Sequence, residues 1–176
     1  EKVIFEKECK LKEIDDYAFA FTKLKKFSVP KSVERLGDYC FINCENLTAI
    51  SFSSDSELKS IGNECFKGTQ IKSFNLPNYI DSYDFSSTVA EKVVFSEKSK
   101  LTSINYFMKS QIQQICIPSS VISITSKAFF ECINLTEVTI NNFENSQLSK
   151  IEKEAFCNCS SLVKFDIPKT VKHFGL

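Results

Sequence analysis

Residues Val121 to Ile140 read VISITSKAFFECINLTEVTI, and the apolar positions in this stretch decide the fold. They follow neither the 3.6-residue period of a helix nor the strict alternation of one long strand. The spacing instead predicts a short strand, Val-x-x-Ile, then a turn through a small residue and a Phe, and then a second strand, Leu-x-x-Val-x-Ile. The same layout recurs along the chain, so this stretch is one unit of a repeat array.

Whole repeats start near residues 11, 33, 58, 80, 101, 121 and 148, with partial repeats at both ends. The opening residues, EKVIFEKECKL, match EKVVFSEKSKL at 91–101, which predicts that the chain begins on a strand at Val3-x-Phe5. The fourth and fifth repeats are shortened, and Phe85 follows Tyr83 by only two residues. We expect residues 1–176 to form one repeat domain. Because neither end carries a polar capping unit, we also expect the chain to be a fragment of a longer array.

One Phe in each repeat follows the turn and keeps step with the aliphatic positions. Each repeat can bury its apolar positions only against its neighbours, so these side chains should form a continuous internal column. The alternative is an exposed aromatic stripe, but recurrence in step with the aliphatic residues favours burial. We call this set the Phe column, and its members are Phe19, Phe41, Phe66, Phe85, Phe107, Phe129 and Phe156.

Two kinds of connection alternate at the ends of the repeats. Prolines close every second repeat, where the missing N–H ends a strand, and they stand at Pro30, Pro77, Pro118 and Pro168. The intervening repeats carry longer polar connections, which should project as a row of loops along one edge. These loops are Ser53–Glu57, Ser96–Lys100 and Asn141–Gln147.

The composition excludes several classes of protein. The chain is 43% hydrophobic and 25% charged, which is typical of an ordered domain and argues against disorder. Its 22 basic and 22 acidic side chains give no net charge, so we expect no nucleic-acid partner. No run of 18 apolar residues is present, and we expect no insertion into a membrane.

Eight cysteines would suit a disulfide framework in a small secreted domain. Most of them, however, occupy repeat positions where other repeats carry Ala, Thr or Ser. A residue that exchanges with these types fills a small buried slot, and free Cys behaves as a small hydrophobe. The pattern therefore predicts mostly free, buried thiols.

The consensus L-x-x-I-x-x-x-A-F-x-x-C-x-x-L-x-x-I-x-I-P resembles the BspA-like, or Treponema-type, leucine-rich repeat family. Cys40-Phe41-x-x-Cys44, Ala128-Phe129-x-x-Cys132 and Ala155-Phe156-x-x-Cys159 carry the motif best. The resemblance covers essentially the whole chain. It implies a leucine-rich-repeat solenoid in which short parallel β-strands stack in a curved array with few or no regular helices. It also implies a place on a cell surface and a role in adhesion to host proteins or cells.

Residue types that carry catalysis are sparse. His173, the only histidine, lies in the last partial repeat, so no Ser–His or Cys–His pair is expected elsewhere. Cys157-x-Cys159 has the wrong spacing for a redox pair. Cys40 and Cys44 could supply two zinc ligands, but both occupy repeat columns, which favours packing. The acidic pair Asp15-Asp16 is expected to face solvent. We therefore expect no enzyme activity, catalytic residue, metal, cofactor or small-molecule substrate.

Three Asn-x-Ser/Thr sequons begin at Asn46, Asn134 and Asn158. The first two are equivalent positions beside a buried Leu and would be explained equally well as turn residues of the motif. The sequons matter only if the protein is secreted.

Side chains alternate along a strand, so residues between the apolar positions of the second strand should point outward. These positions differ in chemistry from repeat to repeat while the core positions hold, which favours a recognition surface over a merely solvated sheet. The candidate face has two columns: Lys26, Ala49, Ser73, Lys92, Gln114, Glu137 and Lys164, then Ser28, Ser51, Asn75, Val94, Cys116, Thr139 and Asp166. The competing surface is the loop edge, with Phe143 as its apolar anchor.

The preferred function is a protein-binding module, and the resemblance places it in an adhesin that is secreted or on the cell surface. There it would contact host or neighbouring-cell proteins. The alternative is a cytoplasmic scaffold, for example one associated with the cytoskeleton. Free thiols favour the alternative, whereas the sequons and the resemblance favour the surface.

Overall fold

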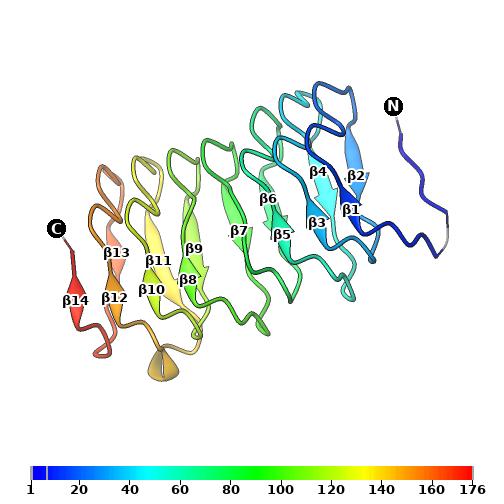
Figure 1. Cartoon of the computed structure of the whole chain (residues 1–176). Helices are drawn as coiled ribbons and strands as arrows, with labels where there is room; N and C mark the ends of the chain where they lie inside the picture. The colour runs from blue at the N-terminus through cyan, green and yellow to red at the C-terminus, as the bar shows by residue number, and fades with distance from the viewer. Residues whose placement is uncertain (1, 7, 176) are drawn as a thin grey trace.

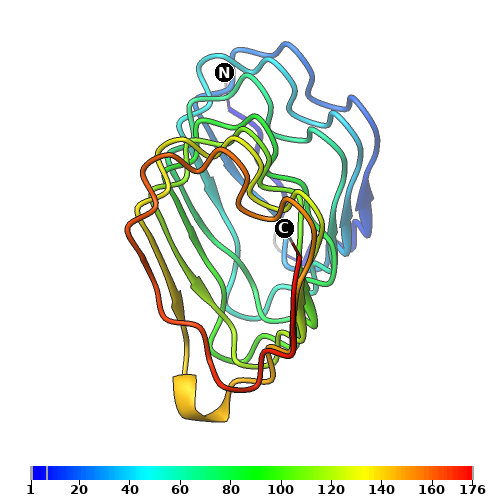
Figure 2. The same cartoon turned by 90° about the vertical axis from the view of Figure 1, so that its left-hand side faces the viewer.

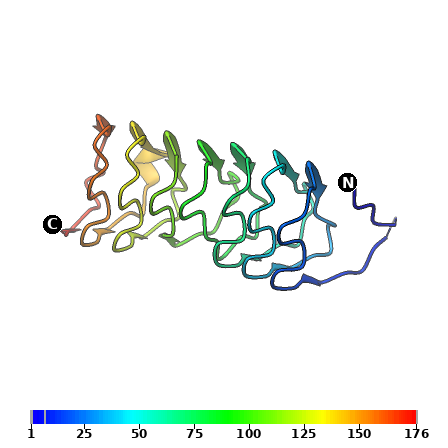
Figure 3. The ribbon, with the colours of Figure 1, turned by 90° about the horizontal axis from the view of Figure 1, so that it is seen from above.

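The computed structural model describes residues 2–6 and 8–175, and it shows a parallel β-solenoid of about seven turns (Figures 1 and 2). Most turns contribute one strand of two residues and one longer strand. The longer strands stack along one side of the array (Figure 3). We call them the long stack: β2 (Lys26–Ser28), β4 (Ala49–Ser51), β6 (Ser73–Asn75), β7 (Lys92–Val94), β9 (Gln114–Ile117), β11 (Glu137–Ile140) and β13 (Lys164–Phe165).

The two-residue strands form a second stack, the short stack. Its members are β1 (Glu13–Ile14), β3 (Arg35–Leu36), β5 (Ser60–Ile61), β8 (Ser103–Ile104), β10 (Ser123–Ile124), β12 (Lys150–Ile151) and β14 (His173–Phe174). A 3-10 turn, Phe143–Asn145, stands out from the connection after β11. All strand pairs are parallel, as the repeat pattern predicted.

Neither stack is one continuous ladder. The long stack divides into β2–β4 and β6–β7–β9–β11–β13. The short stack divides into β1–β3–β5 and β8–β10–β12–β14, and the fourth repeat contributes only the bridge from Ser60 to Ser82. The two breaks fall at different repeats, so each is bridged by the other stack: β3 pairs with β5 beside the first break, and β7 pairs with β6 and β9 beside the second.

The strand expected at Val3-x-Phe5 is not formed, and this prediction was wrong. Residues 91–101, which match the opening stretch, contain β7, and β7 pairs with β6 and β9. In the described chain β2 pairs only with β4, and no backbone hydrogen bond joins it to residues 2–6. The segment packs through side chains instead, with the Phe5 ring 5.8 Å from that of Phe27. Residues 1 and 7 of this stretch lie outside the described residues.

The Phe column is continuous, as predicted. Successive rings stack with interplanar angles of 7° to 24° and centroids 5.2 to 6.4 Å apart. The five central rings are completely buried, and only Phe19 and Phe156 are half-buried. The alternative of an exposed aromatic stripe at these positions is therefore wrong.

A second interior column stands three residues after each Phe and mixes Cys with Thr and Ser. Where it holds Cys, two residues separate it from the next buried Leu, and the thiol donates to the Phe carbonyl of the preceding repeat. These bonds are Cys44 to Phe19, Cys132 to Phe107 and Cys159 to Phe129, at 2.9 to 3.0 Å. The thiols therefore act as hydrogen-bond donors as well as small hydrophobes.

Where this column holds Thr or Ser, only one residue precedes the next buried aliphatic side chain, as in Thr69-Gln-Ile71. The Thr69 hydroxyl donates to its own repeat's Phe66 carbonyl at 2.8 Å, and Thr88 donates to Phe85 at 2.7 Å. Cys therefore occurs where the following turn is one residue longer, and its thiol bonds to the preceding repeat. Thr69 and Thr88 occur where that turn is shorter, and their hydroxyls bond within their own repeats.

The turns around the Phe column use the left-handed backbone region, mostly at residues other than glycine. Residues two positions after the Phe have φ between 54° and 75°, and only Gly68 among them is glycine. Their N–H groups donate to the next repeat, as Asn43 does to Lys67 at 2.7 Å and Glu131 does to Cys157 at 2.9 Å. These inter-repeat hydrogen bonds hold a conformation that side chains with a Cβ rarely adopt.

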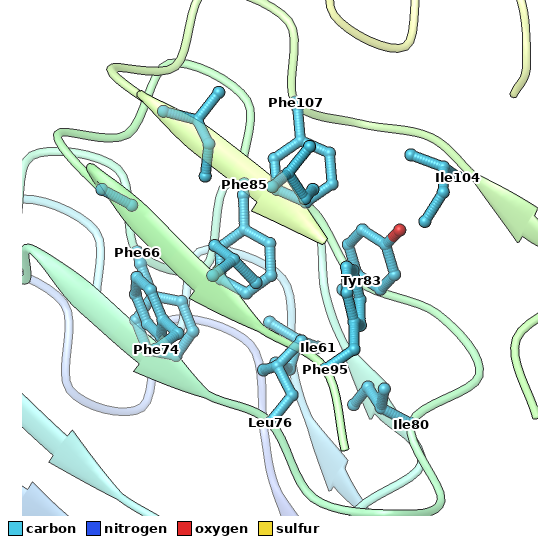
Figure 4. Packing of buried hydrophobic residues seen from close by; sticks show 14 of the residues in the cluster. Ile61, Phe66, Phe74, Leu76, Ile80, Tyr83, Phe85, Phe95, Ile104 and Phe107 are labelled. Atoms are coloured by element: carbon cyan, nitrogen blue, oxygen red, sulfur yellow. The ribbon is translucent and has the colours of Figure 1, made fainter. Parts of the chain in front are cut away.

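The Tyr83 side chain fills part of the space left by the shorter turn of the fourth repeat. Its ring is 2% exposed and lies 5.6 Å from the rings of Phe85, Phe95 and Phe107 (Figure 4). Equivalent positions in whole repeats carry Ile or Leu, and four residues then separate that position from the Phe, whereas only Asp84 separates Tyr83 from Phe85. A larger side chain thus keeps Phe85 in its column. The buried Tyr83 hydroxyl lies near the backbone of Asn105 but makes no regular hydrogen bond within the described residues.

Replacing Phe129 with Ala should lower the free energy of unfolding by about 3–5 kcal/mol, because it opens a cavity between two stacked rings. Urea unfolding followed by circular dichroism measures the loss. Half-buried Phe156→Ala should cost less, and Val163→Ala, at an 86% exposed position, should cost almost nothing. If Phe129→Ala unfolds at the same urea concentration as wild type, the column does not stabilise the array.

Replacing Tyr83 with Phe should keep the packing and remove a buried hydroxyl that lacks a partner. Leaving such a group unsatisfied costs about 1–3 kcal/mol, so the variant should be at least as stable as wild type and more stable by about 1 kcal/mol. Thermal unfolding measures the change, and Tyr39→Phe on a half-buried ring is the control. A clear loss of stability would mean that the hydroxyl is hydrogen-bonded in solution.

Candidate binding surface

The outward positions of the long stack lie where the sequence placed them. In both columns every residue is exposed except Ala49 and Glu137, which are half-exposed. The ladder register aligns the first column, pairing Glu137 with both Gln114 and Lys164. The second column aligns in the same way, with Thr139 opposite Cys116. The structure therefore brings the predicted residues together as two straight rows, with a break between β4 and β6.

Three neighbouring strands, β7, β9 and β11, enclose a shallow hollow on this face. Its volume is about 340 Å³, and we call it the strand hollow. Val94 and Cys116 present apolar surface in it, and Lys92 and Gln114 stand beside them. The six predicted face residues that line it are Lys92, Val94, Gln114, Cys116, Glu137 and Thr139. Backbone alternation alone does not reveal this hollow, since it depends on the sizes of side chains in three repeats.

The two central charges of this face differ in their availability. Glu137 binds Lys164 across the strands at 2.6 Å, and this hydrogen bond raises the pKa of Lys164. Lys92 makes no ion pair within the described part of the chain. The first column therefore offers a free ammonium group at Lys92, whereas Glu137 is already neutralised.

Phe143, the anchor of the competing loop edge, lies beside the strand face. With Thr139 and Asp166 it lines a second depression of about 260 Å³, the Phe143 hollow. The Phe143 side chain is 38% exposed. Sequence analysis treated the face and the loop edge as separate surfaces, but the structure makes them adjacent. The 3-10 turn after β11 brings them together, and its geometry could not be inferred from the repeat pattern.

The structure assembles no catalytic constellation within residues 2–6 and 8–175. His173 is exposed on β14, and no group of three His, Cys, Asp or Glu side chains is positioned to hold a metal ion there. Cys44 uses its thiol in the interior hydrogen bond to Phe19. In the same described residues, no helix is long and apolar enough to cross a membrane.

The acidic pair was expected to face solvent, and this holds only in part for Asp16. Its carboxylate accepts the Asp38 backbone N–H at 2.8 Å and an Arg35 N–H at 2.8 Å. Both bonds favour the charged form and lower the pKa of Asp16. Asp38 accepts the N–H of Asn63 in the same way, so these aspartates join one repeat to the next.

The cysteines are buried less uniformly than predicted. Four are completely buried, namely Cys40, Cys44, Cys65 and Cys132, while Cys9, Cys157 and Cys159 are half-buried. Cys116 is exposed in the strand hollow, because it lies on the outward side of β9. Sequence analysis placed Cys116 in an outward column, and the structure confirms this position.

The sequons differ in accessibility. Asn46 and Asn158 are exposed. Asn134 is half-buried, and its amide donates to Gln111 at 2.6 Å. Both Thr48 and Thr136, the hydroxyl residues of the first two sequons, donate to backbone carbonyls of the preceding repeat. These hydrogen bonds are a structural role for the repeated Asn-Leu-Thr pattern.

Comparison with protein families decides the relationship. The model of the BspA type leucine rich repeat region matches residues 1–89 and 59–176, in six copies. The chain belongs to the BspA-type leucine-rich repeat family. This family is a repeat scaffold of a kind that typically binds without catalysis. No curated protein matches the chain.

Solved structures show the same fold. A leucine-rich repeat protein from Eubacterium ventriosum is 22% identical with a TM-score of 0.71, and this chain aligns over 89% of its length and 42% of that one. The pneumococcal vaccine antigen PcpA is 23% identical with a TM-score of 0.62, over 96% and 45%. A leucine-rich cell surface protein from Faecalibacterium prausnitzii is 20% identical with a TM-score of 0.56, over 94% and 61%. The chain spans less than half the length of the first two.

Thiol reactivity should follow burial. Desolvation raises the pKa of Cys65 and Cys132, and it raises the pKa of Cys159 to about 12. Because the thiolate is the reactive form, Cys116 should react first with Ellman's reagent in native protein. After denaturation without reductant, all or nearly all of the eight cysteines should react. A count below about six, or rapid labelling of Cys132 in native protein, would contradict this assignment.

Proposed function

We propose that the chain is a protein-binding module and that the outward side of the long stack is its recognition surface. The observation that carries this proposal is the strand hollow, where five exposed residues and the half-exposed Glu137, from three strands, meet over a buried core. Protein interfaces need about 800 Å² on each partner. Seven strands spaced about 4.8 Å apart provide a face of roughly 30 Å in length, which is sufficient.

The partner we propose is a protein on a host or neighbouring cell, with the module in a secreted or surface-anchored adhesin. Membership of the BspA-type family supports this location, as does similarity to a surface protein and a vaccine antigen. These similarities are below 25% identity, so they support the fold directly and the location only by analogy. We propose no enzyme activity and no nucleic-acid partner.

A cytoplasmic scaffold is the second candidate, and the unpaired thiols favour it. The two candidates make different predictions about the N-terminus of the full-length protein. A secretory signal peptide would decide for the surface. Co-sedimentation with actin filaments and microtubules would decide for the scaffold.

Gln114→Arg should test the recognition surface, because Gln114 is exposed at the centre of the strand hollow. Fluorescently labelled chain is incubated with cultured epithelial cells, with and without prior trypsin treatment, and bound protein is measured by flow cytometry. We expect trypsin to remove most binding and Gln114→Arg to weaken it about tenfold, with an unchanged melting temperature.

Thr102→Arg is the matched control, since Thr102 is equally exposed but precedes β8 in the short stack. Its binding should equal that of wild type. Phe143→Ala should weaken binding less than Gln114→Arg does. If Phe143→Ala abolishes binding while Gln114→Arg binds normally, the loop edge is the recognition surface. Wild-type binding no greater than that of an unrelated protein would exclude an epithelial partner.

A further inference from the structure

Phe21 occupies a position that neither packing nor backbone preference explains. It lies two residues after Phe19, has φ 59°, and its side chain is 70% exposed. Its N–H donates to the Ile42 carbonyl at 2.9 Å, so the inter-repeat hydrogen bond imposes the left-handed conformation on any residue there. Other repeats place more suitable side chains at this position: Asn43, Gly68, Ser87, Lys109, Glu131 and Asn158.

A large aromatic residue is disfavoured here for two separate reasons. The left-handed region is least costly for Gly, Asn and Asp, and a bulky residue in it is a genuine outlier. An aromatic ring in water also loses the burial that makes such residues stabilising. The Phe21 ring stacks on no other aromatic ring of the described residues. The fold requires the left-handed backbone at this position but not an aromatic side chain, so the exposed ring is the feature that needs an explanation.

The ring borders a hollow of about 390 Å³ on the turn side of the first two repeats, which we call the Phe21 hollow. Its other lining residues are polar: Thr22, Lys23, Asn43, Glu45 and Asn46. Apart from Thr22, their side chains make no hydrogen bond or ion pair with other described residues. The matching positions of the sixth repeat are occupied differently, since Glu131 pairs with Lys109 and Asn134 bonds to Gln111.

We propose that the Phe21 hollow is a binding subsite for a neutral saccharide. A pyranose ring has one apolar face of C–H groups, which fits an exposed phenyl ring, and a rim of hydroxyls that both donate and accept. Lys23 supplies donors, Glu45 supplies acceptors, and the amides of Asn43 and Asn46 supply both. The single Lys and single Glu cancel, which favours an uncharged ligand.

A protein partner fits this site less well. Protein interfaces require a broad patch with an apolar centre. Here a single ring is surrounded by uncommitted polar groups in a small hollow, which is the arrangement expected for a small polyhydroxy ligand. The Phe21 hollow lies on the connecting turns rather than on the long stack, so this inference is independent of the proposed protein-binding face.

Phe21→Asn is the decisive variant. It removes the ring and installs a residue that tolerates the left-handed region, as Asn43 does in the next repeat. We expect its melting temperature to equal or exceed that of wild type while saccharide binding is lost. Lys109→Asn makes the same kind of change at the equivalent position of the fifth repeat and should bind as wild type does.

Binding is measured by saturation-transfer NMR with glucose, galactose, mannose and N-acetylglucosamine, followed by an array of neutral glycans. The chain is produced in a bacterial cytoplasm, where Asn46 carries no glycan that could fill the hollow. We expect transfer to at least one monosaccharide, and Glu45→Ala and Lys23→Ala should each weaken binding by about tenfold.

Four outcomes would overturn the proposal. Absence of saturation transfer and of array binding for wild type would exclude a saccharide. Equal binding by Phe21→Asn would place the site elsewhere. A melting temperature of Phe21→Asn below that of wild type would show that the ring stabilises the fold. Selection of phage-displayed peptides that depend on Phe21, with no saccharide bound, would make it a protein contact instead.

Discussion

Stacking of the Phe column is the interaction on which the solenoid depends, because it runs unbroken through all seven repeats, whereas each stack of strands is interrupted once. Backbone pairing is interrupted between β4 and β6 and again around the fourth repeat. The rings of Phe41, Phe66 and Phe85 nevertheless follow one another at 5.7 and 6.4 Å. The Phe column therefore remains continuous where the ladders do not.

Turn geometry follows from the same constraint. A ring can stack on its neighbour only if every repeat delivers its Phe at the same height and angle. N–H groups at and around the Phe donate to the next repeat, as Phe41 does to Cys65 and Phe129 does to Ala155. These bonds offset the cost of the left-handed residues on either side, which is about 1–2 kcal/mol for each non-glycine residue. This explains how a chain with four glycines can form so many tight turns.

The sequence predicted the parallel strands, the Phe column and the outward rows correctly, because all three follow from strict register between repeats. It could not predict features that depend on a single repeat. Tyr83 fills the space of a missing turn, and that substitution is apparent only when the neighbouring rings are in place. The strand hollow and the closeness of Phe143 to Thr139 arise from side-chain volumes and one irregular connection. The strand expected at Val3 is not formed although its sequence resembles residues 91–101, so local sequence similarity alone does not determine ladder pairing.

Because the interior and the turn hydrogen bonds define the fold, outward positions can change without affecting it. The left-handed position two residues after the Phe illustrates this: its backbone is held by an inter-repeat bond, so Asn43, Lys109, Glu131 and Phe21 all adopt it. The free-energy cost of an unfavourable side chain at this position is then small compared with the stabilisation that comes from contacts between repeats. The fold accepts many side chains at this position, so the presence of an unfavourable one, Phe21, points to a functional reason. The same reasoning applies to Cys116 and Val94, whose apolar surface on a solvated strand adds nothing to the core and therefore supports the proposal that the strand hollow is a binding site.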